Sequence, residues 1–514
     1  MAWSAKFLTA LAEPRRQPIF YVACEQLGDE PGQAWSACSH DGYGAIDLLA
    51  SGSVQVQGQT LDPYNGSTSI GAFSFAIWGT IDNARRALRR GSVLVLRVGF
   101  PGFSLADFEP VALGVVRTWS GKAPAWTVQC HDIFGALQNR LTTDALICRL
   151  FDGLPASDSP STTLSSAVAV GDASYPVAST ALFGSSGKET GGLGLLLVES
   201  SLGDPYYRLW SGVTTGPTAI TISSPGTASL MGTVDIGASG GDNVYLVGYL
   251  SGHPLEIVRK ILHSTGSGTN SYDTYPQTWG YGIPYGYVDS DDIQAYIDST
   301  QATATGTSWQ WAQVGPVDSG LTFLQSFLAG WGGFLAIRQG RITARALFWT
   351  IASDAVRVDT EITDAEVVRV EEYSAYDFTH QLEYTQIRVT TATAYSYSGQ
   401  AEIATLPTGQ YREFDLSDRV YDNESNQRTE VLGRLFEAQT RVPERLVLTL
   451  AGLARAVLCV GDIVKLTTTL VASREQGSDG FNLRDVLVVE VSPDWARGVV
   501  RVALLVYPAG QEGY

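Results

Sequence analysis

The sequence predicts a mainly β protein with minor α content, in which several β-barrel or β-sandwich domains carry short helices. Three observations predict this class. Gly (54 residues), Tyr (23) and Trp (12) are abundant and Met (2) is scarce, a mix that favours strands and turns. Short runs of alternating apolar and polar residues recur along the chain. At roughly 100–200 residues per domain, the length of 514 residues predicts about three to four domains.

Residues 1–155 are expected to form an N-terminal β-barrel domain. Residues 53–58 and 72–77 alternate with period two. Between them, Leu61–Gly66 is a turn cluster that Asp-Pro starts and Asn-Gly closes. The pattern predicts further strands at Gly44–Leu49, Ser92–Gly99, Val111–Trp119 and Trp126–His131, of which the last two should pair.

A short helix is expected over Asp82–Arg90, with Asp82 as the N-cap and Gly91 just beyond its end. Spacings of three and four residues place its arginines on one side of the helix, and these are Arg85, Arg86, Arg89 and Arg90. They form either a salt-bridging face towards an acidic neighbouring subunit or a solvated face that interacts with the helix dipole.

Residues 156–252 are expected to form an inserted small β-barrel or sandwich module. The Ser/Pro/Thr-rich stretch Ala156–Thr163 is typical of a linker. Short β runs separated by Gly-rich turns follow it. These runs are Ser166–Val170, Ser174–Ala178, Leu193–Glu199, Tyr206–Trp210, Ala219–Ser223 and Asp242–Tyr249.

Residues 253–370 are expected to form an α+β domain. Apolar residues at helical spacing predict helices over Pro254–His263, Asp291–Thr300 and Gly320–Leu328. The second of these should be capped by Asp291 or Ser290. Gln339-Gly340 predicts the turn of a hairpin between strands Gly333–Arg338 and Arg341–Ala346.

Residues 371–514 are expected to form a C-terminal β-domain. Gln381–Ala394 alternates strongly, and Glu424–Thr440 is expected to be a helix. The remaining strands are predicted at Arg445–Leu450, Gly461–Thr468, Asp485–Val491 and Gly498–Val506. The last of them is almost entirely apolar and should be buried.

The net charge is −18, from 34 basic and 52 acidic residues. An acidic surface does not attract phosphate backbones, so non-specific nucleic-acid binding is not expected. Such a surface would let DNA slide through a passage without sticking, or it only keeps the protein in solution. No apolar run approaches the roughly 18 residues of a membrane span. Phe7–Ala12 is too short for a signal peptide, so release from a host cell is expected by lysis or within a particle.

The five cysteines are odd in number and contain no CxxC pair, which argues against a zinc site or a disulfide framework. Reduced and mostly buried thiols are expected instead. The residues are Cys24, Cys38, Cys130, Cys148 and Cys459.

Catalytic signatures are lacking, and no catalytic or cofactor-binding residue is predicted. The histidines form no zinc-hydrolase pattern; they are His40, His131, His253, His263 and His380. Cys130 and His131 resemble a thiol with its base, but adjacent residues on a strand point to opposite faces. Neither a nucleophile elbow nor a Walker loop occurs.

Two segments carry alternatives. In Asp289-Ser290-Asp291-Asp292, carboxylates two and three residues apart could hold calcium, but helix capping is the simpler role, so no metal is predicted. Tyr272–Tyr287 contains Trp279, Tyr281 and Tyr285. These aromatic residues could form a sugar-stacking wall, although Tyr and Trp are also favoured at subunit contacts.

Three segments carry a family resemblance, and their order along the chain matters more than any single motif. They are Leu61–Leu137; His253–Tyr296, with Trp279-Gly280-Tyr281-Gly282-Ile283-Pro284; and Gly461–Leu466 with Val486–Val491 and Gly498–Leu505. Together they cover about half the chain and resemble hub proteins, also called minor tail proteins, at the tail tips of long-tailed bacteriophages, and the first is similar to the N-terminal barrel of these proteins. Residues 164–250 resemble a small β-module that is inserted in some of these proteins.

The resemblance implies a non-enzymatic structural subunit of the virion, assembled in the host cytoplasm and located at the tail tip or baseplate. Identical subunits, as a trimer or a hexamer, would surround the DNA channel and contact the tail tube, distal tail and tape-measure proteins. The ring would hold a central fibre or spike and take part in tail assembly and genome ejection. A glycan-binding or glycan-hydrolysing tail component is the main alternative, and a secretion-system hub is a third.

Overall fold

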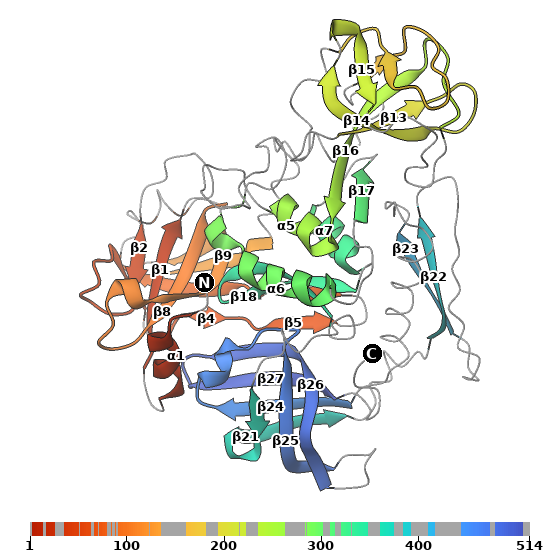
Figure 1. The fold of residues 1–514 in the computed structure, drawn as a ribbon. Helices are drawn as coiled ribbons and strands as arrows, with labels where there is room; N and C mark the ends of the chain where they lie inside the picture. The colour runs from red at the N-terminus through yellow and green to blue at the C-terminus, as the bar shows by residue number, and fades with distance from the viewer. Residues whose placement is uncertain are drawn as a thin grey trace.

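The computed structural model shows a mainly β protein with a few short helices, as the sequence predicts (Figure 1). It describes residues 3–13, 17–25, 35–50, 52–62, 66–69, 71–79, 84, 88, 91–122, 124–134, 161–180, 194–214, 216–222, 235–262, 283, 285–301, 309–313, 320–329, 332–347, 360–374, 384–391, 410–416, 444–472 and 479–506. No helix among these residues is long and apolar enough to cross a bilayer.

The N-terminal strands form a closed barrel. Their order is β10-β9-β8-β1-β2-β3-β7, and β10 pairs again with β7 to complete the circle. Alternating positions of β7 are buried inside it, as expected from the period-two pattern of the sequence. The strands are β1 (Ile19–Glu25), β2 (Ser36–Cys38), β3 (Asp47–Leu49), β7 (Phe73–Trp78), β8 (Val93–Gly99), β9 (Glu109–Lys122) and β10 (Ala125–Asp132); a short strand, β4 (Gln55–Val56), adds to β7, and the 3₁₀ helix η1 (Leu105–Asp107) precedes β9.

One hairpin leaves this barrel and joins the C-terminal half of the chain. It consists of β5 (Gln59–Asp62) and β6 (Ser67–Ser69), which pair on either side of the predicted turn. Gly66 closes that turn at φ +66°, a conformation that glycine adopts without strain. Strand β5 then pairs with β26 of the C-terminal sheet.

A second, smaller barrel follows. Its strand order is β11-β16-β13-β14-β15-β12, and a bridge between Leu164 and Val177 joins the first strand to the last. In Figure 1 this small barrel stands off from the rest of the chain, and β16 runs from it to the helices. The strands are β11 (Ser161–Thr163), β12 (Ser174–Pro176), β13 (Gly194–Glu199), β14 (Tyr206–Thr214), β15 (Ala219–Ile222) and β16 (Asn243–Gly252), with η2 (Gly216–Thr218) before β15.

The helices lie between the barrels and cover a two-stranded hairpin (Figure 1). The hairpin pairs Gly333–Arg338 with Arg341–Ala346 around Gln339 and Gly340, both at positive φ, as the sequence predicts. The elements are α5 (Pro254–Leu262), η3 (Tyr285–Tyr287), α6 (Ser290–Gln301), β17 (Trp309–Gln313), which pairs with β16, α7 (Gly320–Ala329), β18 (Gly333–Arg338) and β19 (Arg341–Ala346).

The C-terminal strands form the third β unit, in the order β20-β25-β26-β27-β24-β21. Strands β20 and β21 are joined by η6 (Asp364–Glu366), so one continuous segment pairs first with β25 and then with β24. The strands are β20 (Glu361–Thr363), β21 (Val367–Ser374), β24 (Glu444–Ala451), β25 (Ile463–Ala472), β26 (Asp479–Asp494) and β27 (Val499–Val506), with η7 (Ala454–Val457) after β24; β22 (Tyr384–Thr391) and β23 (Gln410–Leu416) form a separate parallel pair.

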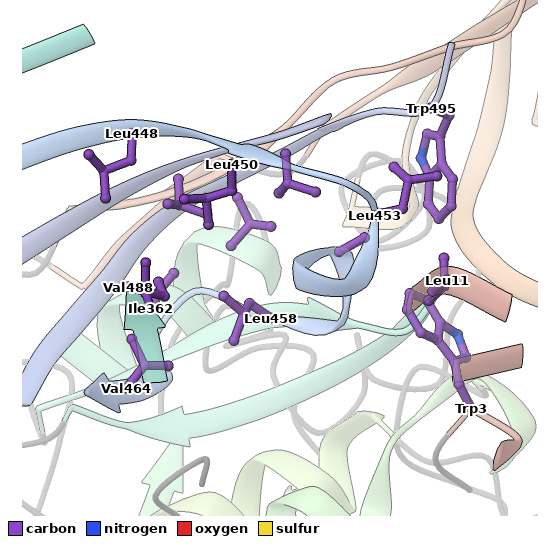
Figure 2. Packing of buried hydrophobic residues seen from close by; sticks show 14 of the residues in the cluster. Trp3, Leu11, Ile362, Leu448, Leu450, Leu453, Leu458, Val464, Val488 and Trp495 are labelled. Atoms are coloured by element: carbon purple, nitrogen blue, oxygen red, sulfur yellow. The ribbon is translucent and has the colours of Figure 1, made fainter. Parts of the chain in front are cut away.

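One hydrophobic core joins the N-terminal barrel and the C-terminal unit. The N-terminal helix α1 (Ala5–Ala12) contributes Phe7 and Leu11, which are fully or almost fully buried. Figure 2 shows Trp3 and Leu11 beside Trp495 and Leu453 of the C-terminal unit. Burying this much apolar surface stabilises the contact between the two ends of the chain.

Some local expectations differ from the structure or lie outside it. The expected strand Ser166–Val170 is reduced to a single bridge at Val168. Most of the helix expected over Asp82–Arg90, with its four arginines, and all of Glu424–Thr440 lie outside the described residues. The division of the chain into four domains, 1–155, 156–252, 253–370 and 371–514, remains a prediction.

A candidate assembly site at the junction of the barrels

A buried arginine, Arg345 on β19, lies where α6, the β18–β19 hairpin and the C-terminal unit meet. Its guanidinium donates two hydrogen bonds to Asp292 of α6, from Nε at 2.8 Å and from Nη2 at 3.1 Å. Its Nη1 atom donates to Asp462 Oδ1 at 2.8 Å and to the Val460 carbonyl at 3.2 Å. A bidentate arginine–carboxylate pair is directional as well as strong, so Arg345 fixes these elements relative to one another.

Asp292 and Asp289 lie at the start of α6 and have arginine and threonine partners. Thr343 Oγ1 donates to Asp292 Oδ2 at 2.7 Å, and Arg338 Nη1 lies 3.2 Å from Asp289 Oδ2. Asp289 Oδ1 also accepts from the Asp292 backbone N–H at 3.4 Å. Asp289 is therefore the cap of this helix, one residue before the position that the sequence predicts, because α6 already begins at Ser290.

The metal alternative for this segment finds no support in the described residues. Arginine side chains occupy the positions beside Asp289 and Asp292, and Asp291 is exposed. No group of three His, Cys, Asp or Glu side chains that could hold a metal occurs in the described part of the chain.

The charges of the junction shift the ionisation of its members. Burial opposes the charged form of Asp292, but the Arg345 charge and hydrogen bonds outweigh it and hold the pKa of this carboxyl below its usual range. Burial likewise opposes the charged form of Arg345, and the Asp292 carboxylate raises the pKa of the guanidinium well above its ordinary value. Burial raises the pKa of the neighbouring Cys459 thiol to about 12. Asp292 and Arg345 are therefore both charged at neutral pH, and the Cys459 thiol is protonated.

Stability should therefore depend on Asp292 in acid. A carboxyl with a lowered folded-state pKa stabilises the fold above its unfolded pKa of about 3.9, and this contribution is lost as the pH falls through the folded-state value. We expect the difference in unfolding free energy between the wild type and Asp292→Asn to shrink from pH 7 to pH 3, as measured by urea denaturation. A difference between the wild type and Asp292→Asn that stays the same from pH 7 to pH 3 would contradict this expectation.

Gly461 brings the C-terminal unit close to the hairpin. Its φ is +87°, and a Cβ atom added there would lie 2.3 Å from Cζ of the buried Phe334 on β18. Gly498 has a φ of +67° but nothing within 4 Å of an added Cβ. Only glycine fits at Gly461, because the backbone has a positive φ and a Cβ atom would collide with the Phe334 ring.

This pair of glycines gives a matched test of the junction. Gly498→Ala should lose about 1 kcal/mol of unfolding free energy, from backbone strain alone. Gly461→Ala should lose about 1–3 kcal/mol of unfolding free energy more than Gly498→Ala, because its methyl group also overpacks the junction. Equal losses in a denaturant titration would show that Phe334 moves aside without cost.

The hairpin turn also contacts the N-terminal segment. The Trp3 backbone N–H donates to Gln339 Oε1 at 2.9 Å, and the Trp3 indole N–H donates to the Pro110 carbonyl of β9 at 2.9 Å. On β18 of the hairpin, the Ile337 carbonyl accepts a hydrogen bond from the side-chain amide of Gln59 on β5 at 2.7 Å. The N-terminal part of the chain and the C-terminal unit, which holds Arg345 through Asp462, are thus attached to the same two-stranded hairpin.

The other candidate residues are not brought together. Cys130 is buried and His131 is exposed, so the two point to opposite faces of β10, as expected. Burial raises the pKa of the Cys130 and Cys38 thiols, which are therefore protonated at neutral pH. The free cysteines Cys24, Cys38, Cys130 and Cys459 are mostly buried. The remaining candidates lie outside the described residues, and these are Cys148, His263, His380 and most of Tyr272–Tyr287.

His40 and His253 have local structural partners. His40 Nδ1 lies 3.1 Å from Ser39 Oγ, and the buried His253 accepts the Leu255 backbone N–H through Nδ1 at the start of α5. Sequence reasoning singled out Asp292 but missed its partners Arg345 and Asp462. These residues are far apart in the chain, and no spacing rule relates them.

Comparison with known proteins finds similar solved structures. No family model matches the sequence, and no curated protein matches it. The chain is similar to a 43 kDa tail protein of prophage MuSo2 from Shewanella oneidensis, with 9% identity over 96% of this chain and 99% of that one and a TM-score of 0.38. It is also similar to a tail protein from Neisseria meningitidis, with 9% identity, coverage of 89% and 97%, and a TM-score of 0.38.

A third similar structure is an E. coli component of the type VI secretion system, whose description notes structural similarity to bacteriophage T4 tail proteins. It shares 11% identity over 92% of this chain and 77% of that one, with a TM-score of 0.33.

Proposed function

We propose that this chain is a structural hub subunit of a bacteriophage tail tip or baseplate. Identical copies form a ring around the DNA channel and link the tail tube to a central fibre or spike. The observation that supports this role best is the Arg345 junction. It ties α6, the hairpin and the C-terminal unit together through buried charged pairs, which suits a subunit that must transmit force without changing shape.

The chemistry of the described residues supports a structural rather than a catalytic role. The carboxylates of the junction are paired with arginines, and the buried thiols are held in the protonated form. A catalytic site usually holds groups with pKa values shifted towards the working pH. Here the pKa values are shifted away from neutral pH: the pKa of Asp292 is lowered, and the pKa values of Arg345 and of the buried thiols are raised.

The proposed partners follow from the same role. A trimer or a hexamer of this chain would contact the tail tube, distal tail and tape-measure proteins, and DNA would pass through its lumen. The net charge of −18 suits a conduit from which DNA must slide freely. The subunit would take part in tail assembly and genome ejection.

Two measurements test this proposal. In isolated tails, an affinity tag on this chain should be located at the tail tip by electron microscopy, with several copies arranged around the axis. The purified chain should release no sugar from host envelope. Absence of the chain from tail tips would overturn the proposal. Sugar release that an acid-to-amide change abolishes would overturn it in favour of the glycan-active alternative.

A further inference from the structure

An apolar row crosses the outer surface of the N-terminal barrel. Trp78 at the end of β7 faces Leu48 of β3 on one side and Ala125 of β10 on the other. Trp78 is 51% exposed and Leu48 is 42% exposed. A tryptophan that remains half exposed beside another exposed apolar side chain is typical of a protein contact surface.

The row ends in basic side chains. Ala125 faces Lys122 of β9 in register, so the row runs across four strands from Leu48 to Lys122; we call these residues the Trp78 row. Lys122 and Arg117 are both exposed. Both lie on the half of β9 after Val116, and strand β7 of the same row contains no charged residue. This face is apolar and basic, although the whole chain has a net charge of −18.

A second apolar surface lies at the end of the small barrel that points away from the helices. Strand β16 leads from Asn243 at that end to α5 at the other, as Figure 1 shows. Val170 and Leu202 occupy turns at the Asn243 end and are 48% and 63% exposed. Both turns adjoin the segment at Ile236 and Gly237, since added Cβ atoms at Gly203 and Gly237 would contact Ile236 and Val170. We call this end the distal tip.

The charge of the distal tip is opposite to that of the Trp78 row. Arg208 is the one basic side chain in the described part of the small barrel, and it is buried against Asp235. The other carboxylates of this part lie at or beside the distal tip, and these are Asp172, Glu199, Asp204 and Asp242. Hydrogen bonds from the backbone N–H groups of Ser201 and Ser239 outweigh burial and lower the pKa of Asp242, so that carboxylate stays charged.

We propose that the distal tip of one copy docks on the Trp78 row of the next copy. The apolar side chains would meet at the centre, and the carboxylates of the tip would face Lys122 and Arg117. Complementary charge around an apolar centre favours one partner and one orientation. The two surfaces belong to different units of the chain, so the contact is head-to-tail, and repetition of such a contact forms a ring when the rotation between copies closes. This inference rests on the proposed ring of identical subunits.

Photo-crosslinking maps the contact directly. Benzoylphenylalanine replaces Trp78 in a mixture of isotopically light and heavy full-length chains, assembled into tails. Mixed light–heavy peptides, which arise only between copies, should join position 78 to residues 165–172, 200–204 or 235–243. Links to any other segment, or an assembled ring without such links, would overturn the docking contact and leave the hub role standing. Absence of the chain from tail tips would instead remove both.

Charge exchange then tests the chemistry of the contact. Lys122→Glu should lower the yield of these links about fivefold, the size expected for one exposed charge pair that becomes repulsive. Adding Asp204→Lys should restore it. Leu202→Ser should lower the yield as well, whereas Leu470→Ser, a similarly exposed leucine on β25, should not. Equal effects of the two serine variants, or no rescue by the charge exchange, would contradict the proposed contact.

Discussion

Arg345→Ala should lower the unfolding free energy by about 3–5 kcal/mol, which is the usual result of removing one partner of a buried ion pair. Arg345 is 2% exposed and bridges Asp292 and Asp462, which are 9% and 5% exposed. Without the guanidinium, the buried Asp462 carboxylate loses the arginine that lies beside it, and Asp292 keeps only Arg338, whose Nη1 atom lies 3.3 Å from Oδ1. A denaturant titration followed by intrinsic fluorescence measures the loss.

Two further variants separate charge from geometry in this experiment. Arg345→Lys keeps the charge but cannot form the bidentate pair, so its loss should be intermediate. Arg497 is 83% exposed and pairs with Asp494 three residues away, and Arg497→Ala should cost no more than about 0.5 kcal/mol. If Arg345→Ala and Arg497→Ala gave similar losses, Arg345 would not hold the junction together.

The sequence predicted the local β structure well because the signals for it are local. The alternation in β7, the Asp-Pro and Asn-Gly turn before Gly66, and the Gln339-Gly340 turn each determine a strand or a hairpin within a few residues. The three helices after residue 253 are found within one or two residues of their predicted bounds. Periodicity and turn chemistry are sufficient for such elements.

The sequence did not predict how the units are joined. Arg345 reaches a carboxylate 117 residues further along the chain, and β5 leaves the N-terminal barrel to pair with β26. Periodicity determines which face of a strand is buried but not which distant strand lies beside it. The Asp289–Asp292 segment shows the same limit. Its spacing allowed both a cap and a metal site, and only the arginines from β18 and β19 decide between them.

Both surfaces of the proposed docking contact also depend on tertiary structure. Leu48 and Trp78 are 30 positions apart by number and become neighbours only because β3 pairs with β7. Val170 and Leu202 lie at the same end of the small barrel only because that barrel closes. In the sequence, these four residues are indistinguishable from core positions, since their exposure is set by strand pairing.

Phe7→Ala should produce the other large loss, about 3–5 kcal/mol, because truncating a fully buried aromatic leaves a cavity. The Phe7 ring is 0% exposed and lies 5.1 Å from the Trp3 ring and 5.5 Å from the Phe100 ring, centroid to centroid. It belongs to the core that α1 shares with the N-terminal barrel and the C-terminal unit. Unfolding free energy from a denaturant titration is again the measurement.

Hydrogen exchange shows whether Phe7 stabilises the contact between the two barrels or only its own helix. A shared core predicts that Phe7→Ala lowers the protection of amides in β8 of the N-terminal barrel and in β24 of the C-terminal unit together, since Val98 and Leu448 both belong to that core. Leu8→Ala, on the same helix but 37% exposed, should change neither strand, because little surface is lost and alanine favours the helix. Loss of protection confined to α1 would mean that each barrel is stable without the helix between them.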